Sequence, residues 1–437
     1  MHKFRINGQR RLRGSVQISG AKNAALPALA ATLLTEDPVM LRGVPPVADV
    51  RTMSKLLGHL GSTVQVLEET PQGGLTVALR GGRPDWTAQA PYELVKTMRA
   101  SVLVLGPALA RTGQARVSLP GGCAIGVRPV DQHLAGLEAL GAQIDLEHGY
   151  VTARADRLTG ANFRFAQPTV GGTENVMMAA TLARGTTRLE NCAREPEIVD
   201  LAALLVAMGA EIEGAGSATI EIEGRESLHG ADHRIIPDRI EAGTYLIAGL
   251  LGDNEVRVEG ALAADLLPLL NELDAMGADL QILEEAIVAR GSELGPREVT
   301  TAPHPGFPTD LQAQFLLLGT QVDGVCKVHE KVFENRFQHV PELNRMGAAI
   351  ELRERTAITS GRRPLSGAAV MATDLRASAC LVLAGLIASG VTEVDRIYHL
   401  DRGYQDMELK LQKLGAEVER IGSNSRRGLE RAKLAPA

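Results

Sequence analysis

The phrase Leu140-Gly141-Ala142-Gln143-Ile144 decides the fold of this chain, because close variants of it recur along the sequence. Each variant has an apolar residue, a glycine, a small or polar residue and then a short apolar–polar alternation. The glycines of the six phrases are Gly61, Gly141, Gly209, Gly277, Gly347 and Gly415. Successive glycines are 80, 68, 68, 70 and 68 positions apart. A nearly constant period of this length predicts six copies of one structural unit.

The residues around each phrase predict the content of the unit. An amphipathic stretch, such as 199–208 or 266–276, precedes the glycine, which is a usual helix stop, and the alternating residues after it predict a strand. A second helix, apolar on nearly every side and therefore expected to be buried, begins each unit. These buried helices are expected at 26–34, 98–110, 175–183, 243–251, 311–319 and 375–388. The predicted order in each unit is helix, strand, helix, strand, strand.

The last unit lacks its final strand, and the start of the chain resembles the missing element. The segment Phe4-Arg5-Ile6-Asn7-Gly8 is followed by Leu12 and Gly14, with the offsets that end other units. Residues 1–21 are therefore expected to complete unit six. The predicted fold class is α/β, with two domains of three units each. One domain spans 22–236 and carries the Cys123 loop; the other combines 1–21 with 237–437, with a disordered tail from about residue 423.

Composition excludes several classes of protein. The chain has 437 residues, of which 45% are hydrophobic and 22% charged, as in soluble globular proteins. A formal net charge of −6 argues against a general binder of nucleic acid or acidic membranes. The four cysteines are far apart and form no metal-binding pattern. Without an N-terminal apolar segment, the expected location is the reducing cytoplasm.

The stretch from Leu119 to Asp131 contains Cys123 among glycines and prolines, with Arg128 five residues further on. Glycine and proline predict a loop here. A thiol near a fixed cation is a candidate reactive centre, because the cation favours the thiolate. The residues alone leave two interpretations open: a reactive centre, or a mobile loop that carries a cysteine.

Charged residues gather where the buried helices begin. If three units surround a common axis, three helix starts meet at one end of each domain and form an anion site. Lys22, Arg99 and Arg376 oppose the helix dipole there, so a bound anion is expected to compensate them. Thr173, Glu174 and Glu241 are expected to be helix caps. These patterns leave Asp310 open, as a cap-like acid or a general base.

Several motifs together resemble one enzyme family. They are Ser19-Gly20-Ala21-Lys22-Asn23-Ala24-Ala25-Leu26-Pro27, Pro120-Gly121-Gly122-Cys123, Arg128-Pro129-Val130-Asp131, Phe307-Pro308-Thr309-Asp310-Leu311-Gln312-Ala313-Gln314 and Asp401-Arg402-Gly403-Tyr404. The sequence resembles the UDP-N-acetylglucosamine 1-carboxyvinyltransferases from about Lys3 to Ile421. The resemblance implies two inside-out α/β barrels and a transferase of peptidoglycan synthesis, and hence a role in cell-wall growth, shape, the cell cycle and division. It implies transfer of enolpyruvyl from phosphoenolpyruvate to the sugar 3′-hydroxyl, with release of phosphate, and neither a metal nor an organic cofactor.

The resemblance also implies roles for single residues. Cys123 is expected to be the general acid, able to form a covalent pyruvate adduct, and Asp310 the base that takes the hydroxyl proton. Phosphate is expected on Lys22, Arg128 and Arg402, and the substrate carboxylate on Arg336 and Arg376. The further substrate-binding positions are Asn23, Arg99, Pro129, Val130, Asp131, Gln132, Gln167, Pro168, Thr169, Val170, Val332 and Asp374, besides Arg128 and Asp310.

Two positions depart from the family pattern, and two other functions stay open. Gln132 stands where relatives commonly have leucine, and Gln167-Pro168-Thr169 replaces a basic version of that loop, which weakens the expected nucleotide contacts. A 3-phosphoshikimate enolpyruvyl transferase shares the fold but is not expected to carry the Cys123 loop. A non-catalytic nucleotide-sugar-binding regulator needs neither an acid nor a base.

Overall fold

The computed structural model describes residues 2–82, 89–96, 98–119 and 130–422, and these form two compact units. One, here called the terminal unit, combines residues 2–18 with 237–422 and so contains both ends of the described chain. The other, the central unit, comprises the described residues between 19 and 236. Each unit has its own hydrophobic core. Cys380 is fully buried in the core of the terminal unit.

The central unit contains three four-stranded sheets of one design. In each, a short edge strand runs parallel to its neighbour and the other pairings are antiparallel. The strand orders are β14-β3-β5-β4, β6-β7-β9-β8 and β10-β11-β13-β12. The strands are β3 (Val39–Val44), β4 (Thr63–Glu69), β5 (Leu75–Arg80), β6 (Gln89–Ala90), β7 (Gln114–Ser118), β8 (Gln143–Glu147), β9 (Tyr150–Arg154), β10 (Asn162–Arg164), β11 (Thr186–Glu190), β12 (Glu211–Glu213), β13 (Thr219–Glu223) and β14 (Asp232–Arg234).

The terminal unit repeats this design, with the first two strands of the chain built into it. The strand orders are β16-β17-β15-β2, β18-β19-β21-β20 and β22-β23-β1-β24. The strands are β1 (Lys3–Asn7), β2 (Arg13–Gln17), β15 (Glu255–Glu259), β16 (Asp279–Ile282), β17 (Ala286–Arg290), β18 (Glu298–Thr300), β19 (Lys327–His329), β20 (Ile350–Arg353), β21 (Thr356–Thr359), β22 (Ala369–Met371), β23 (Val391–Asp395) and β24 (Glu417–Ile421).

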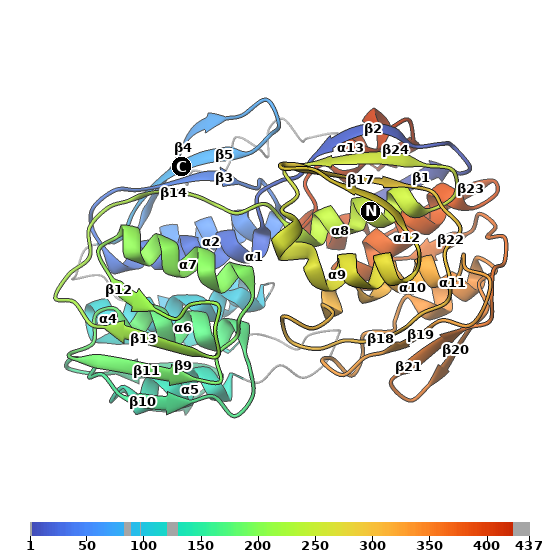
Figure 1. The fold of residues 1–437 in the computed structure, drawn as a ribbon. Coiled ribbons are helices and arrows are strands. Elements are labelled where there is room, and N and C mark those ends of the chain that lie inside the picture. Colours follow the sequence, from blue (N-terminus) through green and yellow to red (C-terminus); the bar gives the residue numbers. More distant parts are fainter. Residues whose placement is uncertain (1, 83–88, 97, 120–129, 423–437) are drawn as a thin grey trace. The chain divides into compact units, whose positions relative to one another are not determined.

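The first strand of the chain fills the place that unit six lacks, as the sequence predicts, but β2 does not belong to that unit, because it pairs with β15 in the sheet of unit four. In β1, Phe4 pairs with Val394 of β23 and Arg420 of β24, both antiparallel. Phe4 and Ile6 are fully buried while Arg5 between them is exposed, which is the alternation of a strand with one buried face. Figure 1 shows β1 and β24 together at the top of the terminal unit.

Each sheet has one strand more than the sequence predicts. The unpredicted strands are the parallel edge strands, five of which have only two or three residues. Segments this short contain too few residues to show a strand alternation.

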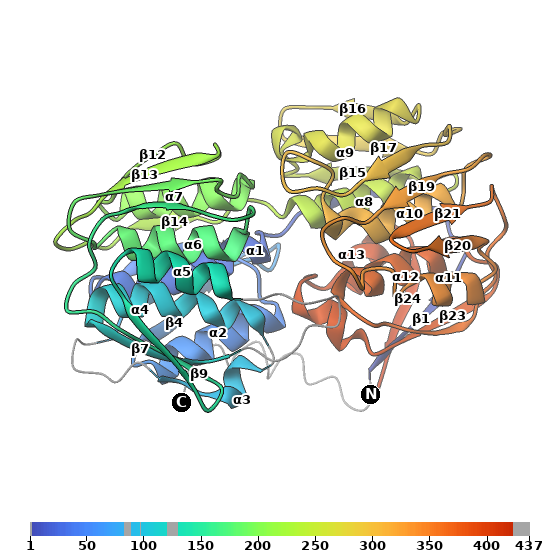
Figure 2. The ribbon, with the colours of Figure 1, turned by 90° about the horizontal axis from the view of Figure 1, so that it is seen from below.

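In each unit some helices are buried and lie at the centre, whereas others, such as α9 (Ala263–Ala275), lie nearer the margin beside the sheets (Figures 1 and 2). The buried helices are α1 (Lys22–Ala31) with η1 (Thr32–Leu34), η2 (Arg99–Val104) with α4 (Leu105–Thr112), α6 (Val170–Ala180), α8 (Arg239–Leu250), η3 (Thr309–Leu311) with α10 (Gln312–Gly319), and α12 (Leu375–Ile387). The other helices are α2 (Ala48–His59), α3 (Tyr92–Val95), α5 (Asp131–Ala139), α7 (Pro196–Ala207), α9 (Ala263–Ala275), α11 (Val340–Arg345), η4 (Ile397–Arg402) and α13 (Met407–Lys413). None of the helices in the described ranges is long and apolar enough to cross a bilayer.

The six glycines of the repeated phrase end helices, as predicted. Their φ angles lie between 85° and 101°, a region open to glycine and strained for other residues. The N–H of Gly141 donates to the Glu138 carbonyl at 2.9 Å, and the next N–H, of Ala142, donates to the Leu137 carbonyl at 3.0 Å. The corresponding long backbone bond after Gly277 joins Ala278 to Leu273, also at 3.0 Å. Bonds of this kind close the last turn of a helix, so the recurring phrase is a recurring helix stop.

Candidate functional site

The side chains that cap the buried helices are not those predicted. Asp374 accepts hydrogen bonds from the N–H groups of Arg376 (2.8 Å) and Ala377 (3.0 Å) at the start of α12. Asp238 accepts from the N–H groups of Ile240 (2.9 Å) and Glu241 (3.0 Å) at the start of α8. Both helices therefore begin with a carboxylate, which satisfies free N–H groups and suits the helix dipole.

In α6 the cap is Thr169, whose hydroxyl oxygen accepts from the Gly172 N–H at 3.3 Å. The predicted caps Thr173 and Glu174 are instead buried inside the helix. Glu241, also predicted to be a cap, forms an ion pair with Lys410 at 2.7 Å. The prediction was wrong because these helices begin about four residues earlier than their apolar pattern does.

The centre of the candidate site in the terminal unit is the carboxylate of Asp310. Its Oδ1 accepts from Arg336 Nη2 at 2.7 Å and its Oδ2 from Arg376 Nη2 at 2.9 Å. The two arginine side chains are only 4% and 5% exposed, whereas that of Asp310 is 26% exposed. Asp310 lies in η3, Arg376 in the first turn of α12 and Arg336 in the segment before α11. The starts of two buried helices therefore meet at this carboxylate, which caps neither of them.

Opposite charges decide the protonation of this cluster. Burial alone would raise the pKa of Asp310, but the charges of Arg376 and Arg336, with their hydrogen bonds, hold that pKa well below its usual value. Burial would lower the pKa of Arg376, but the negative charges of the Asp310 and Asp238 carboxylates, with the hydrogen bond to Asp310, raise it. The contribution of Asp238 shows that the start of α8 also lies close to the cluster. All three helix starts of the terminal unit therefore converge, as the sequence predicts.

Aromatic and polar side chains hold the two arginines in place. The Arg376 guanidinium carbon lies 5.4 Å from the centre of the Tyr404 ring, and that of Arg336 lies 5.5 Å from the centre of the Phe333 ring. The Tyr404 hydroxyl is 2.9 Å from the Thr244 hydroxyl of α8. Cation–π contacts of this kind stabilise a guanidinium over a ring face.

Three further predicted positions belong to the terminal unit. Arg402 ends η4 and is half-buried. Val332 is half-buried, and its N–H donates to Glu330 Oε1 at 2.8 Å. Asp374 uses one carboxylate oxygen as the cap of α12. Beside them lies His339, which the sequence analysis did not select. Burial lowers the pKa of His339 to about 4, with a raising effect from Asp374 and a lowering effect from Arg336.

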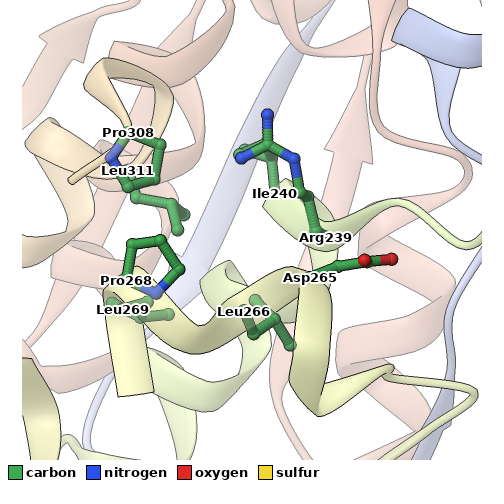
Figure 3. Close-up of a pocket in the computed structure, with 8 residues that line it drawn as sticks. All are labelled: Arg239, Ile240, Asp265, Leu266, Pro268, Leu269, Pro308 and Leu311. Atoms are coloured by element: carbon green, nitrogen blue, oxygen red, sulfur yellow. The ribbon is translucent and has the colours of Figure 1, made fainter. Parts of the chain in front are cut away.

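A shallow surface hollow lies next to this cluster (Figure 3). Residues of α9 form one wall, the start of α8 forms another, and Pro308 and Leu311, on either side of Asp310 in sequence, complete it. The lining residues are Arg239, Ile240, Asp265, Leu266, Pro268, Leu269, Pro308 and Leu311. None of them is a predicted site residue, and most are apolar, so the hollow does not resemble a site for an anion.

In the central unit, Lys22 is the cation at the start of α1. Its Nζ lies 3.5 Å from Asp49 Oδ2 of α2, and the two side chains are 13% and 6% exposed. The sequence analysis did not select Asp49, although an acid in the first turn of the following helix is a detectable signal. Asn23 and Arg99 are half-buried at the starts of α1 and η2.

His133 joins three helices of the central unit. Its Nδ1 lies 3.1 Å from the amide nitrogen of Asn175 in α6. Burial lowers the pKa of His133 to about 4, and the charge of Arg99 lowers it further. Because the Asn175 nitrogen can only donate, His133 Nδ1 is the acceptor and the ring is neutral. The starts of η2 and α6 thus lie close to one another beside α5.

The two departures from the family pattern contact each other. The N–H of Gln167 donates to Gln132 Oε1 at 3.2 Å. Gln132 is half-buried in the first turn of α5, and Gln167 and Pro168 are exposed just before α6. The neighbouring predicted positions are Val130, Asp131, Thr169 and Val170, of which Asp131 is exposed and the others half-buried.

The predicted site residues thus fall into two sets. The terminal unit carries Asp310, Val332, Arg336, Asp374, Arg376 and Arg402. The central unit carries Lys22, Asn23, Arg99, Val130, Asp131, Gln132, Gln167, Pro168, Thr169 and Val170. Cys123, Arg128 and Pro129 lie outside the described residues, as does the predicted tail from 423. Among the residues that the structure describes, no group of three or more His, Cys, Asp and Glu side chains is arranged to hold a metal ion.

Comparison with known proteins adds independent evidence. Residues 6–411 match the family model of EPSP synthase (3-phosphoshikimate 1-carboxyvinyltransferase). A protein of Koribacter versatilis, named UDP-N-acetylglucosamine 1-carboxyvinyltransferase, is 54% identical over 97% of this chain and 97% of its own length. A protein of Anaeromyxobacter dehalogenans with the same name is 58% identical over 96% of this chain and all of its own length.

Solved structures give the same picture at lower identity. The enolpyruvyl transferase NikO from Streptomyces tendae is 29% identical, with a TM-score of 0.87 over 97% of this chain and 99% of its own. EPSP synthase from Acinetobacter baumannii is 17% identical, with a TM-score of 0.76 over 97% of this chain and 100% of its own. At this identity the second likeness concerns the fold alone.

Proposed function

Because the chain belongs to the enolpyruvyl transferase family matched by the EPSP synthase model, and within it to the UDP-N-acetylglucosamine 1-carboxyvinyltransferases, we propose that it transfers enolpyruvyl from phosphoenolpyruvate to the 3′-hydroxyl of UDP-N-acetylglucosamine. Phosphate is the second product. The reaction starts peptidoglycan synthesis and takes place in the cytoplasm, where the free cysteines Cys192, Cys326 and Cys380 stay reduced.

The observation that carries this proposal is the placement of Asp310 between Arg336 and Arg376. Two nearly buried guanidiniums meet there, each paired with the same carboxylate. A carboxylate of the substrate is well matched to two arginines, each of which can donate parallel hydrogen bonds. Asp310 adds a base in direct contact with the same two groups.

Addition and elimination need an acid and a base on the two sides of the reacting carbon. In the addition, the substrate methylene carbon accepts a proton while the sugar oxygen bonds to the adjacent carbon and loses its own proton. In the elimination, the methyl group formed gives up a proton and the C–O bond to phosphate breaks. We assign the donation of the proton to the methylene carbon to Cys123, which in this family also forms a covalent adduct. We assign the removal of the proton from the sugar hydroxyl to Asp310.

The remaining assignments follow the charges of the substrates. Lys22, Arg128 and Arg402 hold the phosphate, and Arg336 and Arg376 hold the carboxylate. The nucleotide-sugar lies along the predicted positions of the central unit, from Asn23 and Arg99 to the loop 167–170, with Asp310, Val332 and Asp374 from the terminal unit. The hydrogen bond from the Gln167 N–H to Gln132 Oε1 supports a role for both residues in the conformation of that loop.

Because the pKa of Asp310 is depressed in the free protein, we expect substrate binding to raise it and so to make Asp310 a stronger base. With both guanidiniums bound to it, Asp310 is a weak base in the free protein. A substrate carboxylate that binds Arg336 and Arg376 brings a second negative charge and competes for the same hydrogen bonds. Both effects raise the pKa of Asp310, so the base strengthens when phosphoenolpyruvate is in place.

The architecture belongs to the same proposal. The two units are the two predicted domains, each an inside-out barrel of three repeats around buried helices. The helix starts of each unit are assigned to the binding of the substrate anions. The six sheets of one design, three in each unit, support this assignment.

Two rival functions are less well supported. Relatives named for the UDP-N-acetylglucosamine reaction are 54% and 58% identical, whereas the EPSP synthase structure is 17% identical. The Cys123 loop also argues against the shikimate reaction. A regulator that only binds a nucleotide-sugar has no use for a carboxylate held by two arginines beside a sugar hydroxyl.

One assay separates the three functions. Phosphate release is measured with phosphoenolpyruvate and either UDP-N-acetylglucosamine or shikimate 3-phosphate, for the wild type and Cys123→Ala. We expect release only with UDP-N-acetylglucosamine, and its loss in Cys123→Ala. Release with shikimate 3-phosphate instead, or no release by the wild type, overturns the proposal.

A further inference from the structure

Glu330 is a buried carboxylate that holds together the segments on either side of the charged cluster. It is 1% exposed. Its Oε1 accepts from the hydroxyl of Thr301 (2.8 Å) and from the N–H groups of Val332 (2.8 Å) and Phe333 (3.0 Å). Its Oε2 accepts from the hydroxyl of Thr309 at 2.8 Å. Four hydrogen bonds to one carboxylate fix its position and those of its donors.

Two of the four donors adjoin the charged cluster, one in sequence and one through its ring. Thr309 directly precedes Asp310 and is the first residue of η3. The Phe333 ring lies against the guanidinium of Arg336, with 5.5 Å between the guanidinium carbon and the ring centre. Glu330 therefore links the segment that carries Asp310 to the segment that carries Arg336.

We propose that Glu330 is a positioning residue for the reaction: through Thr309 and Phe333 it sets Asp310 against Arg336 at the 2.7 Å distance observed. This inference rests on the proposed function. Such a role matters because a misplacement of about 1 Å at a reacting group can reduce the rate on the order of 10²-fold. A single buried side chain that fixes both segments is an efficient way to avoid such a misplacement.

The test compares three variants with the wild type. Glu330→Ala removes all four hydrogen bonds, whereas Glu330→Gln keeps an oxygen for the three donors of Oε1. Asp200→Ala is the matched control, because Asp200 is a buried carboxylate of the central unit bonded to His233 at 3.0 Å and lies outside the proposed machinery. The assay measures kcat, both KM values and the pH profile of kcat at a temperature where every variant is folded.

We expect Glu330→Ala to lower kcat on the order of 10²-fold, more than it raises either KM, and to shift the acidic limb of the pH profile. Glu330→Gln should recover kcat to within about fivefold of the wild type, and Asp200→Ala should keep it within about twofold. Wild-type kcat and pH profile in folded Glu330→Ala overturn the inference. So does a loss that only follows the folded fraction, as in the control.

Thr309→Val keeps the inference testable if Glu330→Ala does not fold. It removes only the bond to Glu330 Oε2 and keeps the branched side chain. We expect kcat to fall by about three- to tenfold with no rise in the KM for phosphoenolpyruvate; an unchanged kcat overturns the inference. If the wild type releases no phosphate, the proposed function is overturned and the role of Glu330 with it. If the wild type is active and substitution of Glu330 leaves kcat unchanged, this inference alone is overturned.

Discussion

The helix starts of the terminal unit and those of the central unit come from the same repeat but treat their charges differently. In the terminal unit, Asp310 bonds to two nearly buried arginines at 2.7 and 2.9 Å. In the central unit, Lys22 and Asp49 are 3.5 Å apart, and His133 stays neutral beside Asn175. The repeat therefore decides where polar groups gather, and the individual residues decide how firmly they are paired.

The largest difference between the units is expected when each acid is removed. Asp310→Asn leaves two nearly buried guanidiniums without their carboxylate, so the free energy of unfolding should fall by about 3 kcal/mol. Asp49→Asn should cost no more than about 1 kcal/mol, because a Lys–Asp pair at 3.5 Å is weaker. Urea unfolding at pH 7 measures both, and equal losses would contradict the comparison. Asp310→Asn should also lower kcat by about 10²–10⁴-fold.

The same variant has a pH signature. The folded pKa of Asp310 is depressed, so its contribution to stability is present above the unfolded pKa of about 3.9 and is lost as the pH falls through the folded value. The stability difference between wild type and Asp310→Asn should stay constant from pH 7 to about pH 5 and shrink below pH 4. A difference that shrinks already between pH 7 and 5 would show that the carboxylate is not held by the arginines.

A buried histidine in each unit gives the next largest effect. His133 and His339 both have a folded pKa of about 4, below the ordinary value of 6.5, because burial disfavours the charged ring. Below pH 6.5 the unfolded chain takes up a proton that the folded protein refuses, so each ring destabilises the fold progressively down to about pH 4. Replacing either histidine with glutamine should therefore change the free energy of unfolding more favourably at pH 5 than at pH 7, by about 2 kcal/mol.

Unfolding of His133→Gln and His339→Gln at a series of pH values checks this. The two variants should give the same pH dependence although they lie in different units. A variant whose effect does not change between pH 7 and 5 would mean that its ring has the same pKa in the folded protein as in the unfolded chain, as a solvent-accessible ring does.

The repeat itself should behave alike in both units. Gly141 and Gly277 end helices with φ of 93° and 85°, and an added Cβ would meet no atom within 4 Å at Gly141 and only the Glu293 carbonyl at 3.8 Å at Gly277. Alanine at either position should therefore cost only the backbone strain, about 1 kcal/mol. Thermal unfolding of Gly141→Ala and Gly277→Ala should give shifts within error of each other. A clear difference would mean that the two helix stops are not equivalent.

The smallest effect is expected at the contact between Gln132 and Gln167. Gln132→Leu removes a hydrogen bond between partly exposed groups, so stability should change by about 0.5 kcal/mol or less. The KM for UDP-N-acetylglucosamine should rise about two- to threefold while kcat stays unchanged, since the loop shapes only ground-state binding. Steady-state kinetics measures this; a fall in kcat would place the loop closer to the chemistry.

The sequence predicts the repeat well because its signal is local. A glycine that must adopt positive φ, followed by alternating residues, identifies each helix stop and the strand after it. The place of β1 beside β23 and β24 follows from the same offsets, although nearly 400 residues separate the partners. The short edge strands could not be predicted, since segments such as Asn162–Arg164 contain too few residues to form a pattern.

The site is predicted in part for the same reason. The residue types at Asp310, Arg336 and Arg376 signal an anion and a base, but the sequence does not show that these three bind one another. Their pairing depends on side-chain directions across two helix starts and a loop. Glu330 escapes detection because a buried carboxylate and an exposed one look alike in sequence, whereas Asp49 is an acid in the first turn of α2, which is a signal that the sequence does carry.

The most direct test of the account is the pKa of Asp310 with and without phosphoenolpyruvate. The carboxyl carbon of Asp310, labelled with ¹³C and assigned by its absence in Asp310→Asn, can be titrated by NMR in Cys123→Ala, in which we expect no turnover. The account predicts a pKa well below 3.8 in the free protein and a higher one when phosphoenolpyruvate is bound. An unchanged or lower pKa on binding would contradict it, because the substrate carboxylate would then not share Arg336 and Arg376 with the base.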